Sequence, residues 1–143
     1  MPALAAGLSL LSVAGVIAVT LLGTRQAPLP LAFGAMAAAS IFIVPFAEQH
    51  HYTLAALPVC VAVGEWSRGI QRSPGRASAL RTTGLLLSLS MLLIGLPLPY
   101  ESPALARGAL ALLAYPRLYG GLLLWGLLLW LARPAARLVT DQP

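Results

Sequence analysis

The sequence predicts an all-α membrane protein: a single transmembrane domain over residues 1–143, built as a polytopic helix bundle with about five spanning helices. Of its 143 residues, 59% are hydrophobic and only 9% are charged, whereas an ordinary soluble domain is about one-quarter charged. Apolar runs of about the length that crosses a bilayer, roughly 20 residues, alternate with short polar segments. All nine basic residues are arginines, and most of them gather in every second polar segment.

The first two spans are expected at residues 3–22 and 29–46, joined by a turn at 24–28. No basic residue precedes the first apolar run and Arg25 follows it, which reverses the charge pattern of a secretory signal. We therefore interpret this run as a spanning helix. Because the chain opens directly within it, we expect the chain to be the tail of something longer.

The third span is expected at residues 49–66, with Pro58 as a kink whose freed carbonyl neighbouring helices can satisfy. The polar segment after it contains four arginines, so residues 67–82 are predicted to form a cytoplasmic loop. The fourth and fifth spans, at 83–96 and 118–131, are stopped by prolines. Both are short for a straight crossing, since a helix rises about 1.5 Å per residue.

Residues 97–117 are predicted to form an external segment that contains a short interfacial helix. Apolar residues on one helical face indicate this helix, namely Leu105, Ala109, Leu112 and Leu113. The alternative is one long broken helix over residues 104–132.

The arginines predict the orientation of the bundle. If the turn after the first span, the 67–82 loop and the C-terminal tail share one side, that side holds seven of the nine arginines. By the positive-inside rule this side is cytoplasmic, so the N-terminus lies outside and the C-terminus inside the plasma membrane. The external side then gathers nearly every group capable of chemistry: Glu48, His50, His51, Tyr52, Glu101, Arg107, Arg117 and Tyr119.

The adjacent histidines, His50 and His51, have three competing interpretations. Neighbouring residues of a helix point about 100° apart, so the pair is poorly placed to share a metal ion, and no metal site is predicted. The two rings, beside Glu48 and Tyr52, can be polar groups solvated at the membrane boundary. Alternatively, one imidazole can hydrogen-bond or protonate a substrate that arrives from the bilayer.

Arg117 is the second candidate group. Followed by Tyr119 and two glycines, it can present a planar fork of donors to a phosphate while the glycines permit close approach. The competing interpretation is an arginine that anchors the helix at the membrane boundary. Both interpretations remain open from the residues alone.

Several functional classes are disfavoured. The arginines occupy loops without an aromatic and basic stripe, which argues against nucleic-acid binding. Glycine-rich phosphate loops and other catalytic motifs are missing from the sequence, and no cofactor is predicted. A transporter usually keeps an ionisable residue in mid-membrane, and these spans have none away from their ends.

Two stretches resemble one family. VPFAEQHHYTLAALPVCVAV is similar to a motif of glycosyltransferase family 87, integral-membrane GT-C enzymes that use polyprenyl-phosphate mannose. That motif combines Ser-Pro, an acid, two histidines and an aromatic residue with a following Leu-Pro; here Val44 replaces the serine. YPRLYGGLLLWGLLLWL is similar to the last helix of these enzymes. The resemblance covers most of this chain but only the C-terminal third or so of the family.

This resemblance implies a hexosyltransferase of the cell envelope, a mannosyltransferase in the named family. It would transfer a sugar, with inversion, from a polyprenyl-phosphate donor to a lipid or glycan acceptor on the external face. His50 or His51, with Glu48 and Tyr52 beside them, would border the acceptor or the donor phosphate. Arg117 and Tyr119 would adjoin the donor's lipid phosphate. The family's catalytic carboxylate belongs to an N-terminal loop that this chain lacks, so we expect the chain to be inactive alone.

Two rival functions remain. One is a small non-catalytic membrane subunit or scaffold, in which the histidines are only interfacial. The other, with less support, is a small transporter. Besides membrane lipids, the expected partners of the enzyme are its donor, its acceptor and the missing N-terminal part.

Overall fold

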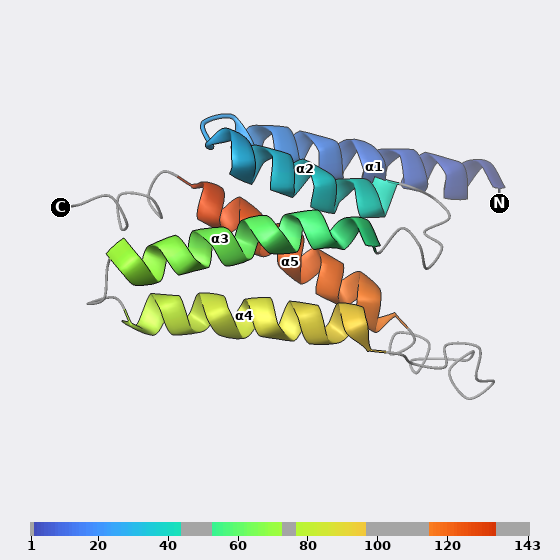
Figure 1. The fold of residues 1–143 in the computed structure, drawn as a ribbon. Coiled ribbons are helices and arrows are strands. Elements are labelled where there is room, and N and C mark those ends of the chain that lie inside the picture. Colours follow the sequence, from blue (N-terminus) through green and yellow to red (C-terminus); the bar gives the residue numbers. More distant parts are fainter. Residues whose placement is uncertain (1, 44–52, 73–76, 97–114, 134–143) are drawn as a thin grey trace.

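The computed structural model describes residues 2–43, 53–72, 77–96 and 115–133 (Figure 1). These residues form five α-helices and no strand, so the all-α prediction is confirmed for them. The helices are α1 (Pro2–Thr24), α2 (Leu29–Ile43), α3 (Ala56–Arg72), α4 (Ala77–Gly95) and α5 (Pro116–Ala132).

Helices α1 and α2 form an antiparallel hairpin. The hydroxyl of Thr24 donates to the carbonyl of Thr20 one turn earlier, at 2.7 Å, so this polar side chain is satisfied within an apolar helix. The chain then turns, and the N–H of Ala27 donates to the carbonyl of Thr24 at 2.8 Å. The carbonyl of Pro28 accepts a bond from the first turn of α2. The hairpin therefore closes without leaving these backbone groups unpaired.

Helix α3 begins and ends later than the predicted span 49–66. A short 3₁₀ turn at residues 53–55 precedes it, and Pro58 lies in its first turn, where a helix leaves N–H groups unpaired in any case. Pro58 therefore lies at the start of α3 rather than at a kink within it. At the other end α3 continues to Arg72 and α4 begins at Ala77.

Much of the segment predicted as a cytoplasmic loop, residues 67–82, is consequently helical: 67–72 belong to α3 and 77–82 to α4. Arginine and glutamine in residues 67–72, and alanine, leucine and arginine in residues 77–82, have high helix propensity, so these segments extend both helices beyond the predicted apolar spans. The predicted interfacial helix and the alternative broken helix involve residues 97–114, which lie outside the described residues. Helix α5 itself begins at Pro116.

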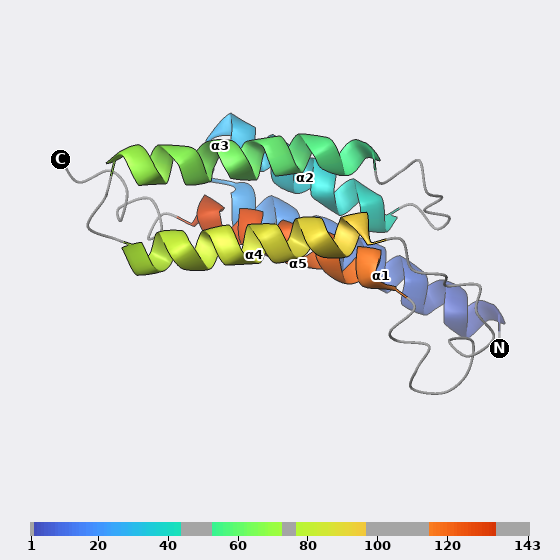
Figure 2. The same cartoon turned by 60° about the horizontal axis from the view of Figure 1, so that its bottom comes forward.

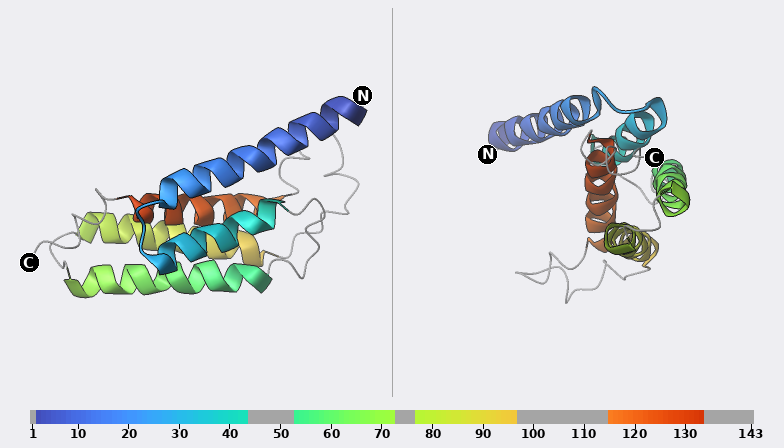
Figure 3. Two further views of the ribbon diagram at one scale, coloured as in Figure 1. Left: turned by 90° about the horizontal axis from the view of Figure 1, so that it is seen from above. Right: turned by 90° about the vertical axis from the view of Figure 1, so that its left-hand side faces the viewer.

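Helix α5 is the centre of the bundle, because it contacts each of the other four helices. Viewed end-on, α2, α3 and α4 form an arc and α5 crosses the inner side of that arc (Figure 3). Helix α5 begins beside the end of α4 and runs obliquely away from it (Figure 1), while the N-terminal part of α1 diverges from the other helices (Figures 2 and 3). Buried residues recur at every fourth position of α5: Pro116, Gly120, Leu124, Leu128 and Ala132. Side chains four residues apart form a ridge along a helix, and such a ridge packs into the groove of a neighbouring helix.

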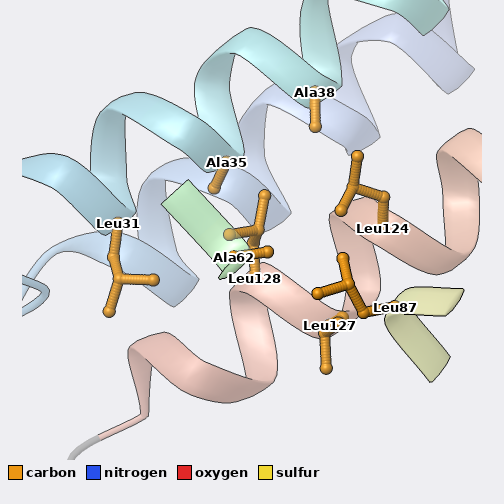
Figure 4. Close-up of a cluster of buried hydrophobic side chains, with 8 residues drawn as sticks. All are labelled: Leu31, Ala35, Ala38, Ala62, Leu87, Leu124, Leu127 and Leu128. Atoms are coloured by element: carbon orange, nitrogen blue, oxygen red, sulfur yellow. The ribbon is translucent and has the colours of Figure 1, made fainter. Parts of the chain in front are cut away.

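The core pairs small residues with large ones (Figure 4). Ala35 and Ala38 of α2 are 0% and 1% exposed, and they face Leu124 and Leu128 of α5, which are fully buried. Small side chains let two helix backbones approach, and the leucines fill the space that remains. Ala62 of α3 joins the same cluster.

Many large apolar side chains are exposed on the outer surface of the described helices. On α1, Leu8 and Leu11 are 63% and 71% exposed, and large apolar side chains of α4 are exposed as well. Residues Ala6–Thr24 and Ala77–Gly95, 19 residues each, are long and apolar enough to cross a membrane. Helix α4 is thus longer than its predicted span and is not short for a crossing. Two shorter apolar helices, Leu29–Ile41 and Pro116–Ala132, accompany them.

Candidate functional site

The two ends of the bundle differ in charge. The turn between α1 and α2, the end of α3, the start of α4 and the end of α5 lie at one end (Figure 1). We call it the arginine-rich end, since it carries five arginines of the described residues: Arg25, Arg68, Arg72, Arg81 and Arg133. Helix α5 begins at the opposite end, with Arg117 as its second residue. Arg117 therefore stands apart from the other described arginines.

The first turn of α5 has the features of an anion-binding helix start. Pro116 occupies one of its first two positions, where the fixed φ of proline suits a helix. Tyr115 precedes it without capping the helix through its side chain. Backbone N–H groups and the positive end of the helix dipole favour an anion there. The partly buried Arg117 adds a planar fork of charged donors that matches phosphate oxygens.

Arg117 and Tyr119 leave α5 in different directions. Two positions along a helix correspond to a rotation of about 200°, so the two side chains start on nearly opposite sides. Tyr119 is 39% exposed, whereas Arg117 is partly buried. A single small ligand at this helix start is therefore better placed to contact Arg117 than to contact both residues.

The start of α5 is held against the end of α4 by a very close contact. A Cβ added at Gly120 would lie 2.8 Å from the backbone oxygen of Ser90 and 2.9 Å from the backbone nitrogen of Ile94. Only glycine permits this approach. The Ser90 hydroxyl, which is fully buried, donates to the carbonyl of Gly120 at 2.7 Å. The contact fixes the position of the turn that carries Arg117.

The other predicted site residues lie in a segment outside the described residues. These are Glu48, His50, His51 and Tyr52. The segment joins α2 to α3, and α2 ends and α3 begins at the same end of the bundle as the start of α5 (Figure 1). Its chain neighbours are thus at the Arg117 end, and the roles of these four residues stay predictions.

Two buried hydroxyl residues were not singled out by the sequence. Ser90 anchors α4 to α5, and Thr20 does the same for α1, because the indole N–H of Trp125 donates to the Thr20 hydroxyl oxygen at 3.0 Å. Both residues are fully buried. Hydroxyl residues within apolar helices were the available signal, since such groups often bond across membrane helix interfaces.

Acidic and metal-binding chemistry is sparse in the described part of the chain. Glu65 is its one carboxylate, and it forms an ion pair with Arg68 one turn along α3, near the arginine-rich end. Histidine, cysteine, aspartate and glutamate do not gather in threes anywhere in the described ranges.

Comparison of the chain with protein families, with curated proteins and with solved structures finds no match. The candidate site thus consists of Arg117 on the first turn of α5 and the packing of Gly120 against Ser90 and Ile94 that holds this turn. Its chemistry is that of a cationic, partly buried position at one end of an apolar bundle.

Proposed function

We propose that the chain is the lipid-phosphate-binding part of a membrane glycosyltransferase of the GT-C type. The enzyme transfers a hexosyl group, mannosyl in the family it resembles, from a polyprenyl-phosphate sugar to a lipid or glycan acceptor on the external face. The observation that carries this proposal is the position of Arg117. It is partly buried on the first turn of α5, at the bundle end opposite the arginine-rich end.

A location within the membrane is supported by the exposed apolar surface. Leu8 and Leu11 belong to a helix that is apolar around its whole circumference, and such a surface is stable in lipid but unfavourable in water. The arginine-rich end then faces the cytoplasm by the positive-inside rule. Arg117 consequently faces the external leaflet, where a polyprenyl-phosphate sugar would present its phosphate.

The proposed role of Arg117 follows from the charge that develops during transfer. When the bond between the sugar and the phosphate breaks, the leaving polyprenyl phosphate gains negative charge. A guanidinium that donates two parallel hydrogen bonds stabilises that charge, and the positive end of the α5 dipole adds to the effect. The described residues near Arg117 include no carboxylate, so the base that activates the acceptor hydroxyl is assigned to another part of the enzyme.

Binding of polyprenyl phosphate to the purified chain in lipid nanodiscs tests this proposal without requiring turnover. Arg117→Ala is expected to weaken binding about tenfold or more, because hydrogen bonds to charged groups contribute about 1.5–3 kcal/mol and about 1.4 kcal/mol is a factor of ten. Arg117→Lys keeps the charge but loses the planar fork, and an intermediate loss is expected.

Arg133→Ala is the matched control, since it removes the same charge just beyond the other end of the same helix. It should leave the affinity for polyprenyl phosphate unchanged. A polyprenol without phosphate should bind wild type and Arg117→Ala equally. Equal losses in the Arg117→Ala and Arg133→Ala variants, or no loss in either, would refute the assignment and favour a non-catalytic membrane subunit.

A further inference from the structure

A second site lies between α3 and α4 at the arginine-rich end. A shallow, open hollow of about 340 Å³ lies between the ends of the two helices. It is lined by Trp66, Ile70, Ala77, Leu80 and Arg81. Four of these five residues are apolar or aromatic and one is a cation, which is the composition of a pocket for an amphipathic anion. Neither Arg117 nor its supporting residues take part in it.

The walls of the hollow are fixed by close contacts between the helices. The indole N–H of Trp66 donates to the carbonyl of Leu80 at 2.9 Å. A Cβ at Gly84 would lie 3.0 Å from the indole ring, and a Cβ at Gly69 would lie 2.8 Å from the Leu80 side chain. Because its donor is already used, Trp66 offers the hollow an apolar ring. The pocket is thus formed before any ligand enters.

Arg81 is the cationic group of the hollow. Its side chain is exposed, and it makes no hydrogen bond or ion pair with any residue that the structure describes. Arg68 on the facing helix differs, since Glu65 already neutralises it. Ile70 is 47% exposed beside the same opening. An unneutralised guanidinium therefore adjoins an accessible apolar wall.

We propose that this hollow binds an anionic phospholipid of the surrounding bilayer. The lipid phosphate contacts Arg81, and the glycerol and first acyl carbons lie against Trp66 and Ile70. A phospholipid fits better than a soluble anion, because tryptophan and arginine at a helix end mark the membrane boundary, where both parts of a lipid are present. The inference rests on the proposed membrane location but not on sugar transfer.

The test measures which lipids remain bound to the protein. Wild type and variants are reconstituted in nanodiscs of equal parts phosphatidylglycerol and phosphatidylcholine, and native mass spectrometry gives the ratio of the two lipids retained. Wild type should retain more phosphatidylglycerol. Arg81→Ala should lower the ratio about fivefold, the effect of one arginine beside an anionic lipid surface.

Two further variants separate a seated lipid from general charge attraction. Ala77→Phe fills the hollow and keeps Arg81, so it should lower the ratio as Arg81→Ala does; Ala77→Val replaces it if the larger side chain prevents folding. Arg25→Ala removes the same charge at the same end but outside the hollow, and it should preserve the ratio.

Three results would overturn the proposal: no preference for phosphatidylglycerol in wild type, an equal loss in Arg25→Ala and Arg81→Ala, or full preference in the pocket-filling variant. Polyprenyl phosphate binding is measured in the same samples, and Arg81→Ala leaves the Arg117 site intact. Loss of the lipid preference without loss of polyprenyl phosphate binding therefore concerns the hollow alone, whereas failure of the proposed function appears as a lack of polyprenyl phosphate binding.

Discussion

Ser90 of α4 and Gly120 of α5 meet at a very close approach of these two helices. The Ser90 hydroxyl donates to the carbonyl of Gly120 at 2.7 Å, and the missing side chain of Gly120 leaves room for the backbone of α4. Membrane helices commonly combine a small residue with a polar bond in this way. Because Gly120 lies within one turn of Arg117, the contact sets where the guanidinium stands relative to α4.

Gly120→Ala is expected to destabilise the bundle by about 1–3 kcal/mol, the usual cost of adding a group to a packed interface. The new Cβ would lie 2.8–2.9 Å from backbone atoms of Ser90 and Ile94, and backbone cannot move aside as a flexible side chain can. Reversible denaturation of the protein in detergent micelles measures this loss. The variant should also bind polyprenyl phosphate less tightly than wild type.

Gly126→Ala is the control, because it lies on the same helix and a Cβ there meets nothing within 4 Å. It should be neutral or stabilising by up to about 1 kcal/mol, since alanine has the higher helix propensity. If both alanine variants lost stability to the same extent, the loss would come from placing alanine anywhere on α5, and the contact with α4 would not explain it.

Ser90→Ala should cost about 0.5–1.5 kcal/mol, the net contribution of one hydrogen bond. The same denaturation assay measures it. Ser88→Ala removes a hydroxyl from an exposed position two residues earlier on α4 and should have almost no effect. A Ser90→Ala variant as stable as Ser88→Ala would mean that glycine packing alone joins the two helices.

The all-α class could be predicted from the sequence because apolar runs of membrane length dominate it. The bounds of α3 and α4 could not be predicted from the sequence. Hydropathy marks where an apolar surface ends, whereas a helix continues as long as its residues favour it, and residues 67–72 and 77–82 are helical although they contain Arg68, Arg72 and Arg81. For the same reason Pro58 was predicted in mid-helix but lies in the first turn of α3.

The candidate site was predictable only in part. Arg117 stood out because a cation two residues before a tyrosine and two glycines is unusual in an apolar sequence. The role of Ser90 could not be predicted, because it depends on the register of α4 against α5 and on a partner 30 residues away. Likewise, the different directions of the Arg117 and Tyr119 side chains can be inferred only once both residues are known to lie in one helix.

Thr20→Val should weaken the attachment of α1 to α5. The indole N–H of Trp125 donates to the Thr20 hydroxyl oxygen at 3.0 Å, and valine keeps the shape of threonine but removes this acceptor. We expect a loss of about 1–2 kcal/mol in the denaturation assay, whereas Thr20→Ser, which keeps the hydroxyl, should lose less. If serine and valine were equally destabilising, packing of the threonine methyl group rather than the hydrogen bond would hold α1.

Cysteine labelling tests the predicted orientation, on which the external position of the Arg117 site depends. In a Cys60→Ser background, Gln49→Cys should react with a membrane-impermeant maleimide in intact cells, because residue 49 follows α2 in the sequence and precedes α3, and α2 ends and α3 begins at the Arg117 end.

Ser73→Cys is the matched probe of the opposite face, since residue 73 directly follows α3 in the sequence and α3 ends at the arginine-rich end. It should react only after permeabilisation, because the side with seven of the nine arginines is expected to stay in the cytoplasm. The reverse pattern would invert the bundle. Arg117 would then face the cytoplasm, and a donor presented in the external leaflet could not reach it.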